Sequence, residues 1–302
     1  MRHLWLVLAL ALTSASLFSA ALVQRRVFRA AGVPLPVGFV LRVTLASNSL
    51  SVGLPFAGSA AGTAFSYRQY RKMGAPAGAA SWALVTSGAI SLAVLGSILL
   101  VGETISAQED SPIFVLTLAV LAVLLWASRS RLMSSSLVRR LLESLVDRER
   151  RAGPHHGTPG GRCPDATSKA QDGPVAVRID RRCARTCVAF STVNWIGDLV
   201  ALAVCIAAAG SAIPWSNLCA VYAVALGAAS FSFLPAGIGI VETAIAVALV
   251  RSGISTANAA QAAVLYRAVS CWLPIAAGWI GYTSFRRGPL HQFETDTASS
   301  SR

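Results

Sequence analysis

The sequence predicts an all-α polytopic membrane protein, a helix bundle with two broken, re-entrant helical hairpins in an inverted repeat. Of its 302 residues, 54% are hydrophobic and only 13% are charged, whereas soluble domains carry about 25% charged residues. Several apolar runs approach or exceed the ~20 residues that a spanning helix needs. Two of these runs contain a central proline, Pro55 and Pro235, and proline interrupts a helix.

The charge pattern favours a membrane surface as partner over nucleic acid. The formal net charge is +13, and much of it lies in one block, residues 129–185. In a membrane protein such a block indicates the cytosolic side and attracts anionic lipid headgroups. We therefore expect no nucleic-acid partner.

The sequence contains no motif for catalysis or metal binding. A His-Glu-x-x-His zinc motif and a nucleophilic serine elbow are both absent. Cys183 and Cys187 lack the further ligands that a metal site needs, and free thiols are expected in the cytosol. We expect no enzyme activity, no catalytic residues, no metal and no cofactor.

The N-terminal membrane half, residues 1–128, begins with the apolar run Leu4–Val23. Arg25, Arg26 and Arg29 follow it directly. Because basic residues favour the cytosolic side, this run is predicted to be a membrane helix that runs inward.

The first broken hairpin is predicted over Phe39–Tyr67. Basic residues flank it on both sides, so both of its ends face the cytosol. With Pro55 at the bend, each arm has about 13 to 15 residues, or ~20 Å of helix. This is shorter than the ~30 Å apolar core of a bilayer, which favours a re-entrant hairpin over two full spans.

Two spans and a connector follow this hairpin. Ala79–Val101 is predicted to run outward and residues 113–128 to return inward, joined by a loop whose charges are all acidic. Residues 129–189 form a basic cytosolic connector that is expected to attract anionic headgroups. Part of it, residues 152–174, is rich in Gly, Pro, Ser and Thr and is predicted to be disordered.

The C-terminal membrane half, residues 190–287, contains the second broken hairpin. Phe190–Gly210 is predicted to span outward, and the hairpin occupies Asn217–Val250. Because proline lacks a backbone donor and glycine resists helix formation, the helix should break at Pro235 and restart near Gly239.

The last predicted span, Ala259–Tyr282, runs inward, and the tail at residues 288–302 is polar and predicted to be disordered. This order of spans places the N-terminus outside and the C-terminus in the cytosol. We therefore expect a multi-pass protein of the cell membrane.

The two halves share a pattern that predicts an internal repeat. Pro55 and Pro235 both follow a leucine, and Gly74 and Gly253 stand at similar distances after them. The first hairpin starts and ends inside, whereas the second starts and ends outside. Halves of opposite orientation are typical of several secondary transporters.

Four sequence elements carry a resemblance to a known family. They are Asn48-Ser49-Leu50, Leu54-Pro55-Phe56-Ala57-Gly58, the run from Leu234 to Glu242, and Leu265-Tyr266-Arg267. Together they resemble the flippase-like transmembrane domain family, the membrane half of the lysylphosphatidylglycerol synthase/flippase proteins. The resemblance covers Leu4–Tyr282 and implies a lipid-translocating or lipid-handling domain. It does not extend to the soluble aminoacyl-transfer domain of the synthases, so tRNA-dependent aminoacylation is not expected. Ala236 stands where the family often has glycine.

Charged and polar residues at membrane depth are the candidate site, because they are costly in lipid. Glu242 and Arg267 lead, either as a pair or as headgroup ligands, since an arginine fork matches phosphate oxygens and a carboxylate suits a cationic amine. The other candidate substrate-binding residues are Tyr266, Asp198, Asn48 and Arg42. The candidate hinge residues at the two breaks are Pro55, Gly58, Pro235, Gly237 and Gly239.

Two further interpretations of these residues stay open. Helix N-termini after the two prolines are suited to present backbone donors to an anion. Alternatively, Asp198, Glu242 and Arg267 form a buried ionic lock that only holds the bundle together.

The sequence thus predicts a flippase-like integral membrane protein that binds or translocates a phospholipid or polyprenyl-type lipid across the cytoplasmic membrane. The alternative is a non-catalytic membrane subunit or partner of a cell-envelope lipid- or glycan-modifying enzyme. Membrane lipids are the expected partners in both cases. The sequence carries no signal for an oligomeric state.

Overall fold

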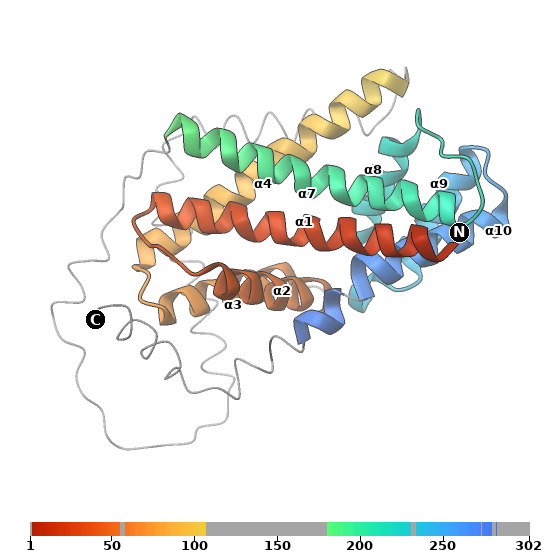
Figure 1. The fold of residues 1–302 in the computed structure, drawn as a ribbon. Helices are drawn as coiled ribbons and strands as arrows, with labels where there is room; N and C mark the ends of the chain where they lie inside the picture. Colours follow the sequence, from red (N-terminus) through yellow and green to blue (C-terminus); the bar gives the residue numbers. More distant parts are fainter. Residues whose placement is uncertain are drawn as a thin grey trace, which may run out of the picture.

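The structure is a computed structural model that describes residues 2–54, 58–106, 180–230, 234–272, 274–279 and 282. Every regular element within these ranges is helical, which confirms the predicted all-α class (Figure 1). Four stretches are long and apolar enough to cross a membrane: Leu4–Ala30, Ala77–Gly102, Arg181–Ala208 and Thr256–Trp279. The chain is therefore a multi-pass membrane protein. The predicted span at 113–128, most of the connector and the tail at 288–302 lie outside the described residues.

Three long helices form the frame of the bundle. They are α1 (Arg2–Ala30), α4 (Ala77–Ser106) and α7 (Arg181–Ala208), with 29, 30 and 28 residues. At 1.5 Å per residue each is about 42–45 Å long, more than the ~30 Å apolar core of a bilayer. Figure 1 shows α1 and α7 side by side and antiparallel. A Cβ added at Gly197 of α7 would lie 3.5 Å from the Leu12 carbonyl of α1, an ordinary van der Waals contact, so the two helices pack against each other at this point.

The first hairpin consists of α2 (Val37–Gly53) and α3 (Gly58–Lys72), and its predicted break is confirmed. Leu54 is extended, with φ −100° and ψ 127°, because a following proline disfavours the helical region. The arms have 17 and 15 residues, about 26 and 23 Å, which is longer than predicted but still shorter than the bilayer core. A Cβ added at Gly58 or Gly62 would collide with Ser51 of α2. The glycine spacing therefore lets the two arms pack closely.

The second hairpin consists of α8 (Leu218–Ser230), the short 3₁₀ turn η2 (Pro235–Gly237) and α9 (Ile240–Arg251). Helix α8 ends at Ser230, before the predicted break at Pro235, whereas α9 starts directly after Gly239, as predicted. Three residues of the break have positive φ: Ala236 (57°), Gly237 (66°) and Gly239 (84°). Two of them are glycines, which adopt this region at little cost, whereas Ala236 adopts it against its own preference.

The bend of the second hairpin packs against the first hairpin. Turn η2 of the second hairpin contacts α2 of the first. Figure 1 shows the first hairpin joined to the bundle at one end and the second joined at the opposite end, so they enter from opposite directions. This arrangement fits the predicted opposite orientation, while a repeat relating the two halves stays a prediction.

The last described segment is a helix with a local defect. Helix α10 (Thr256–Arg267) continues into a π-helical turn, η3 (Ala268–Trp272), and a further helical stretch covers residues 274–279. Pro274 explains the defect, because it has no N–H to continue the α-helical pattern. The Ser49 hydroxyl of α2 lies 3.1 Å from the Ile275 carbonyl, so the first hairpin packs directly against this segment.

Candidate functional site

The start of α9 is capped by the carboxylate of Glu242. The backbone N–H of Gly239 donates to Oε2 of Glu242 at 2.7 Å, which satisfies one of the free donors of a helix N-terminus. The sequence predicts that this N-terminus presents donors to an anionic ligand. In the structure the protein's own carboxylate takes that position, so a substrate anion would have to displace it.

Arg267 reaches the same break from α10. Its Nε lies 3.0 Å from Oε1 of Glu242, and the two side chains are only 8% and 14% exposed. Nη2 of Arg267 also donates to the backbone carbonyl of Ala236, inside η2. One cation therefore contacts both the carboxylate that caps α9 and the carbonyl of the residue in the left-handed conformation.

Asp198 forms a second polar cluster next to this pair. Its Oδ2 accepts hydrogen bonds from the hydroxyls of Tyr222 at 2.8 Å and Tyr266 at 2.9 Å. These side chains come from α7, α8 and α10, so the carboxylate ties three helices together. Tyr266 precedes Arg267 in α10, which places the two clusters side by side. Of the three residues in the predicted ionic lock, Glu242 and Arg267 form an ion pair. The carboxylate of Asp198 is instead bound by the two tyrosines.

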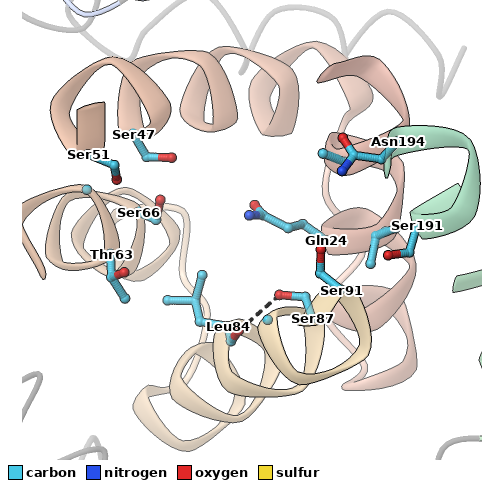
Figure 2. A pocket seen from close by; sticks show the side chains of 14 residues that line it. Gln24, Ser47, Ser51, Thr63, Ser66, Leu84, Ser87, Ser91, Ser191 and Asn194 are labelled. Carbon is cyan, nitrogen blue, oxygen red and sulfur yellow. Dashed lines mark hydrogen bonds between the residues drawn. The ribbon is translucent and has the colours of Figure 1, made fainter. Parts of the chain in front are cut away.

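A polar cavity of about 260 Å³ lies between five helices. Figure 2 shows hydroxyl groups arranged around it, with the Gln24 side chain extending into its centre. The lining comes from α1, α2, α3, α4 and α7, and its residues are Ala20, Val23, Gln24, Ser47, Ser51, Gly62, Thr63, Ser66, Leu84, Ser87, Gly88, Ser91, Ser191 and Asn194. None of these residues carries a formal charge.

One face of α7 joins the cavity to the Asp198 cluster. Ser191 and Asn194 line the cavity, and Asp198 follows Asn194 by one helical turn. Residues separated by three, four and seven positions share one face of a helix. Ser191, Asn194 and Asp198 therefore lie on one face of α7, and Asp198 is hydrogen-bonded to Tyr266, the residue before Arg267.

The structure brings together four of the six predicted binding residues. Glu242 pairs with Arg267, and Tyr266 binds Asp198. Arg42 is exposed, and its Nε contacts the Gly38 carbonyl of its own helix at 3.3 Å. Asn48 is half-buried on α2 and is not among the residues that line the cavity.

The predicted hinge residues fall at the two breaks. Gly237 and Gly239 have positive φ, and Gly58 begins α3 in close contact with α2. Pro235 begins η2, while Pro55 lies outside the described residues. Their role as hinges stays a prediction.

Sequence reasoning missed Tyr222 and the whole polar cavity. Single serines are common in membrane helices, so a serine by itself does not indicate a binding site. The available signal was their spacing, since Ser47 and Ser51, and also Ser87 and Ser91, are four residues apart and share a helix face.

These features define the class of protein: an integral membrane helix bundle with a polar interior and a buried ion pair at a broken helix. More specifically, the chain belongs to the family described as lysylphosphatidylglycerol synthase TM region, whose model matches residues 1–278. This confirms the resemblance seen in the sequence and makes the chain a membrane protein of a family connected with lipid modification and flipping. A comparison with curated proteins gives no match.

Proposed function

We propose that this protein binds the polar headgroup of a membrane lipid inside its helix bundle and moves it between the two leaflets. The observation that carries the proposal is the uncharged polar cavity between five helices. Asp198 follows it by one turn on α7, and the same bundle holds the buried Arg267–Glu242 pair. Polar groups at membrane depth are costly and are typical of substrate pathways. The lipid's acyl chains stay in the bilayer while its headgroup crosses through the polar region.

The two hairpins support a translocation step. The described arms of both hairpins are shorter than a full membrane span, and turn η2, which Arg267 contacts, packs against α2. Broken helices with a binding site at the midplane are a recurring transporter design. A shift of either hairpin would open the polar region toward one leaflet.

The orientation is part of the proposal. The end of the bundle that carries Arg25, Arg26 and Arg29 faces the cytosol, because cytosolic ends are enriched in Lys and Arg. The proposed process has no chemical step, so the protein acts without catalytic residues. Its alternative role as the partner of an envelope enzyme stays a prediction, because the basic connector on which that rests lies outside the described residues.

The test is lipid exchange in reconstituted vesicles. The full chain is incorporated into liposomes with trace fluorescent phosphatidylglycerol, and dithionite then bleaches the label in the outer leaflet. We expect protein-dependent bleaching beyond the outer-leaflet fraction. Asn194→Leu should slow it, because an apolar side chain then enters the cavity. The neighbouring Val193→Leu is the matched control, since Val193 is 49% exposed.

The same assay is run with labelled phosphatidylethanolamine and with a labelled polyprenyl phosphate. If the protein accelerates exchange of none of the three lipids, the proposal fails. If Asn194→Leu and Val193→Leu slow exchange equally, the cavity is not the pathway.

A further inference from the structure

We propose that the cavity binds an uncharged polyhydroxylated group, between glycerol and a single sugar in size, carried on a lipid. This inference rests on the proposed function, because it names the class of headgroup that the bundle accepts. The argument comes from which hydrogen-bonding atoms in the cavity are already used and which are left.

The two carboxamides in the cavity are held in fixed orientations. Oε1 of Gln24 accepts a hydrogen bond from the Tyr70 hydroxyl at 2.6 Å. Oδ1 of Asn194 accepts one from the Ser16 hydroxyl at 3.0 Å. Since each amide oxygen is engaged with the protein, each NH₂ group remains as a donor for the cavity.

Several lining hydroxyls are left as acceptors. Ser47 donates to the Thr44 carbonyl at 3.1 Å, and Ser87 donates to the Leu84 carbonyl at 3.0 Å. Thr63 likewise donates to a carbonyl of its own helix, at 2.8 Å. A hydroxyl whose hydrogen is committed in this way still has lone pairs to accept a ligand's hydrogen.

One lining hydroxyl is buried without a partner. Ser191 is 1% exposed, and its Oγ has no hydrogen-bond partner within the described part of the chain. Figure 2 places Ser191 at the cavity beside Asn194. A buried hydroxyl left unpaired destabilises the fold. Because Oγ has almost no accessible surface, a ligand in the cavity would pair with it only after a small shift of the neighbouring side chains.

A ligand for this cavity must therefore both donate and accept hydrogen bonds. A phosphate only accepts and is typically bound by Arg or Lys. A primary ammonium only donates hydrogen bonds, and a quaternary ammonium has no hydrogen to donate. Both are typically balanced by a carboxylate. The described residues that line the cavity carry none of these charges. Hydroxyl groups of a polyol do both, and the 260 Å³ volume corresponds to about eight or nine water volumes at ~30 Å³ each.

The test measures lipid binding to the full-length protein in nanodiscs by native mass spectrometry. The probes are glucosyl diacylglycerol and phosphatidylglycerol, which carry hydroxyl-rich headgroups, and diacylglycerol, phosphatidate and phosphatidylcholine, which do not. Free methyl glucoside is the probe for a soluble polyol. We expect the first two lipids to be retained and the other three to be lost on washing.

Three substitutions distinguish the cavity from general surface binding. Ser191→Ala should weaken retention of glucosyl diacylglycerol by about tenfold, and Ser87→Ala should also weaken it. Ser97→Ala is the control for Ser87→Ala, because Ser97 lies on the same helix, makes the same bond to its own helix at 2.8 Å and is exposed. Ser191→Ala should leave the thermal midpoint unchanged or higher, since it removes an unpaired buried hydroxyl.

The outcomes separate this inference from the proposed function. Equal retention of phosphatidylcholine, or unchanged binding in Ser191→Ala and Ser87→Ala, overturns the polyol assignment even if vesicle exchange remains protein-dependent. If glucosyl diacylglycerol binds, the two substitutions weaken that binding, and no lipid exchange is seen, the polyol site is supported and translocation is overturned. If methyl glucoside binds as tightly as glucosyl diacylglycerol and the same substitutions weaken it, the polyol chemistry is supported. The conclusion that the polyol is carried on a lipid is then overturned.

Discussion

Replacing Glu242 by glutamine removes one charge from a buried pair and leaves the other without compensation. The Nε–Oε1 distance is 3.0 Å and the side chains are 8% and 14% exposed. At an effective dielectric constant of about 20, the attraction at this distance is about 5.5 kcal/mol. Much of it only offsets the desolvation of the two ions, but loss of one partner of a buried pair typically costs about 3–5 kcal/mol. We expect this destabilisation from Glu242→Gln and from Arg267→Gln.

The double variant Glu242→Gln/Arg267→Gln provides the decisive comparison. It has no uncompensated charge, and glutamine at position 242 still offers an oxygen to the N–H of Gly239. We therefore expect it to be more stable than the sum of the two single losses predicts, by at least about 2 kcal/mol.

The assay is thermal unfolding of the purified variants in detergent. A loss of 3–5 kcal/mol corresponds to a midpoint about 6 °C lower or more. Arg42→Lys is the control, because Arg42 is exposed and surface substitutions usually change stability by less than about 0.5 kcal/mol. Midpoint shifts that simply add in the double variant would refute the reasoning.

The same variants separate an ionic lock from a binding site. If the pair only holds the bundle together, the double variant regains lipid exchange together with its stability. If Arg267 also binds a headgroup, stability recovers and exchange does not. Glu242→Gln and Arg267→Ala are each expected to impair exchange more than Arg42→Lys does.

Three other predictions concern the backbone and the topology. Ala236→Gly should stabilise the protein by about 1 kcal/mol, because φ is 57° there; an unchanged thermal midpoint would contradict this. Gly62→Ala should lower the midpoint through a clash between the hairpin arms, whereas Gly227→Ala, with open space around it, should not; equal shifts would show that the arms do not pack as described. Cysteines introduced at Lys72, an exposed residue at the end of α3, and at Ser252 in a cysteine-free background should react with an impermeant maleimide from opposite sides of the membrane, and labelling from one side would disprove the opposed hairpins.

The breaks in the helices could be predicted because their causes are local. Pro235 removes a backbone donor, and Gly239 adopts a φ that few other residues accept, so the sequence gives the break within a few residues. Helix lengths were predicted less well. The apolar run predicts a helix from Phe190, whereas α7 begins at Arg181, because hydropathy indicates the membrane-embedded part and not the polar turns beyond it.

The site could be predicted only where a residue is unusual at membrane depth. Glu242 and Arg267 stand out by their charge, and their pairing is confirmed. The partners of Asp198 were not predictable, because a tyrosine such as Tyr222 is ordinary in a membrane helix and the contact joins residues 24 apart. The cavity depends on five helices meeting, which no local pattern encodes.

The contact between η2 and α2 has a mechanical consequence. Where other helices cross the bilayer in one continuous rod, here two short elements share that thickness, and turn η2 of one contacts α2 of the other. A continuous helix tilts in a thinner bilayer and thins a thicker one around itself. A joint between two short elements is instead expected to be pulled apart by a thicker bilayer and pressed together by a thinner one. The acyl-chain length of the surrounding lipid thus acts directly on the place where Arg267 contacts Ala236 and Glu242.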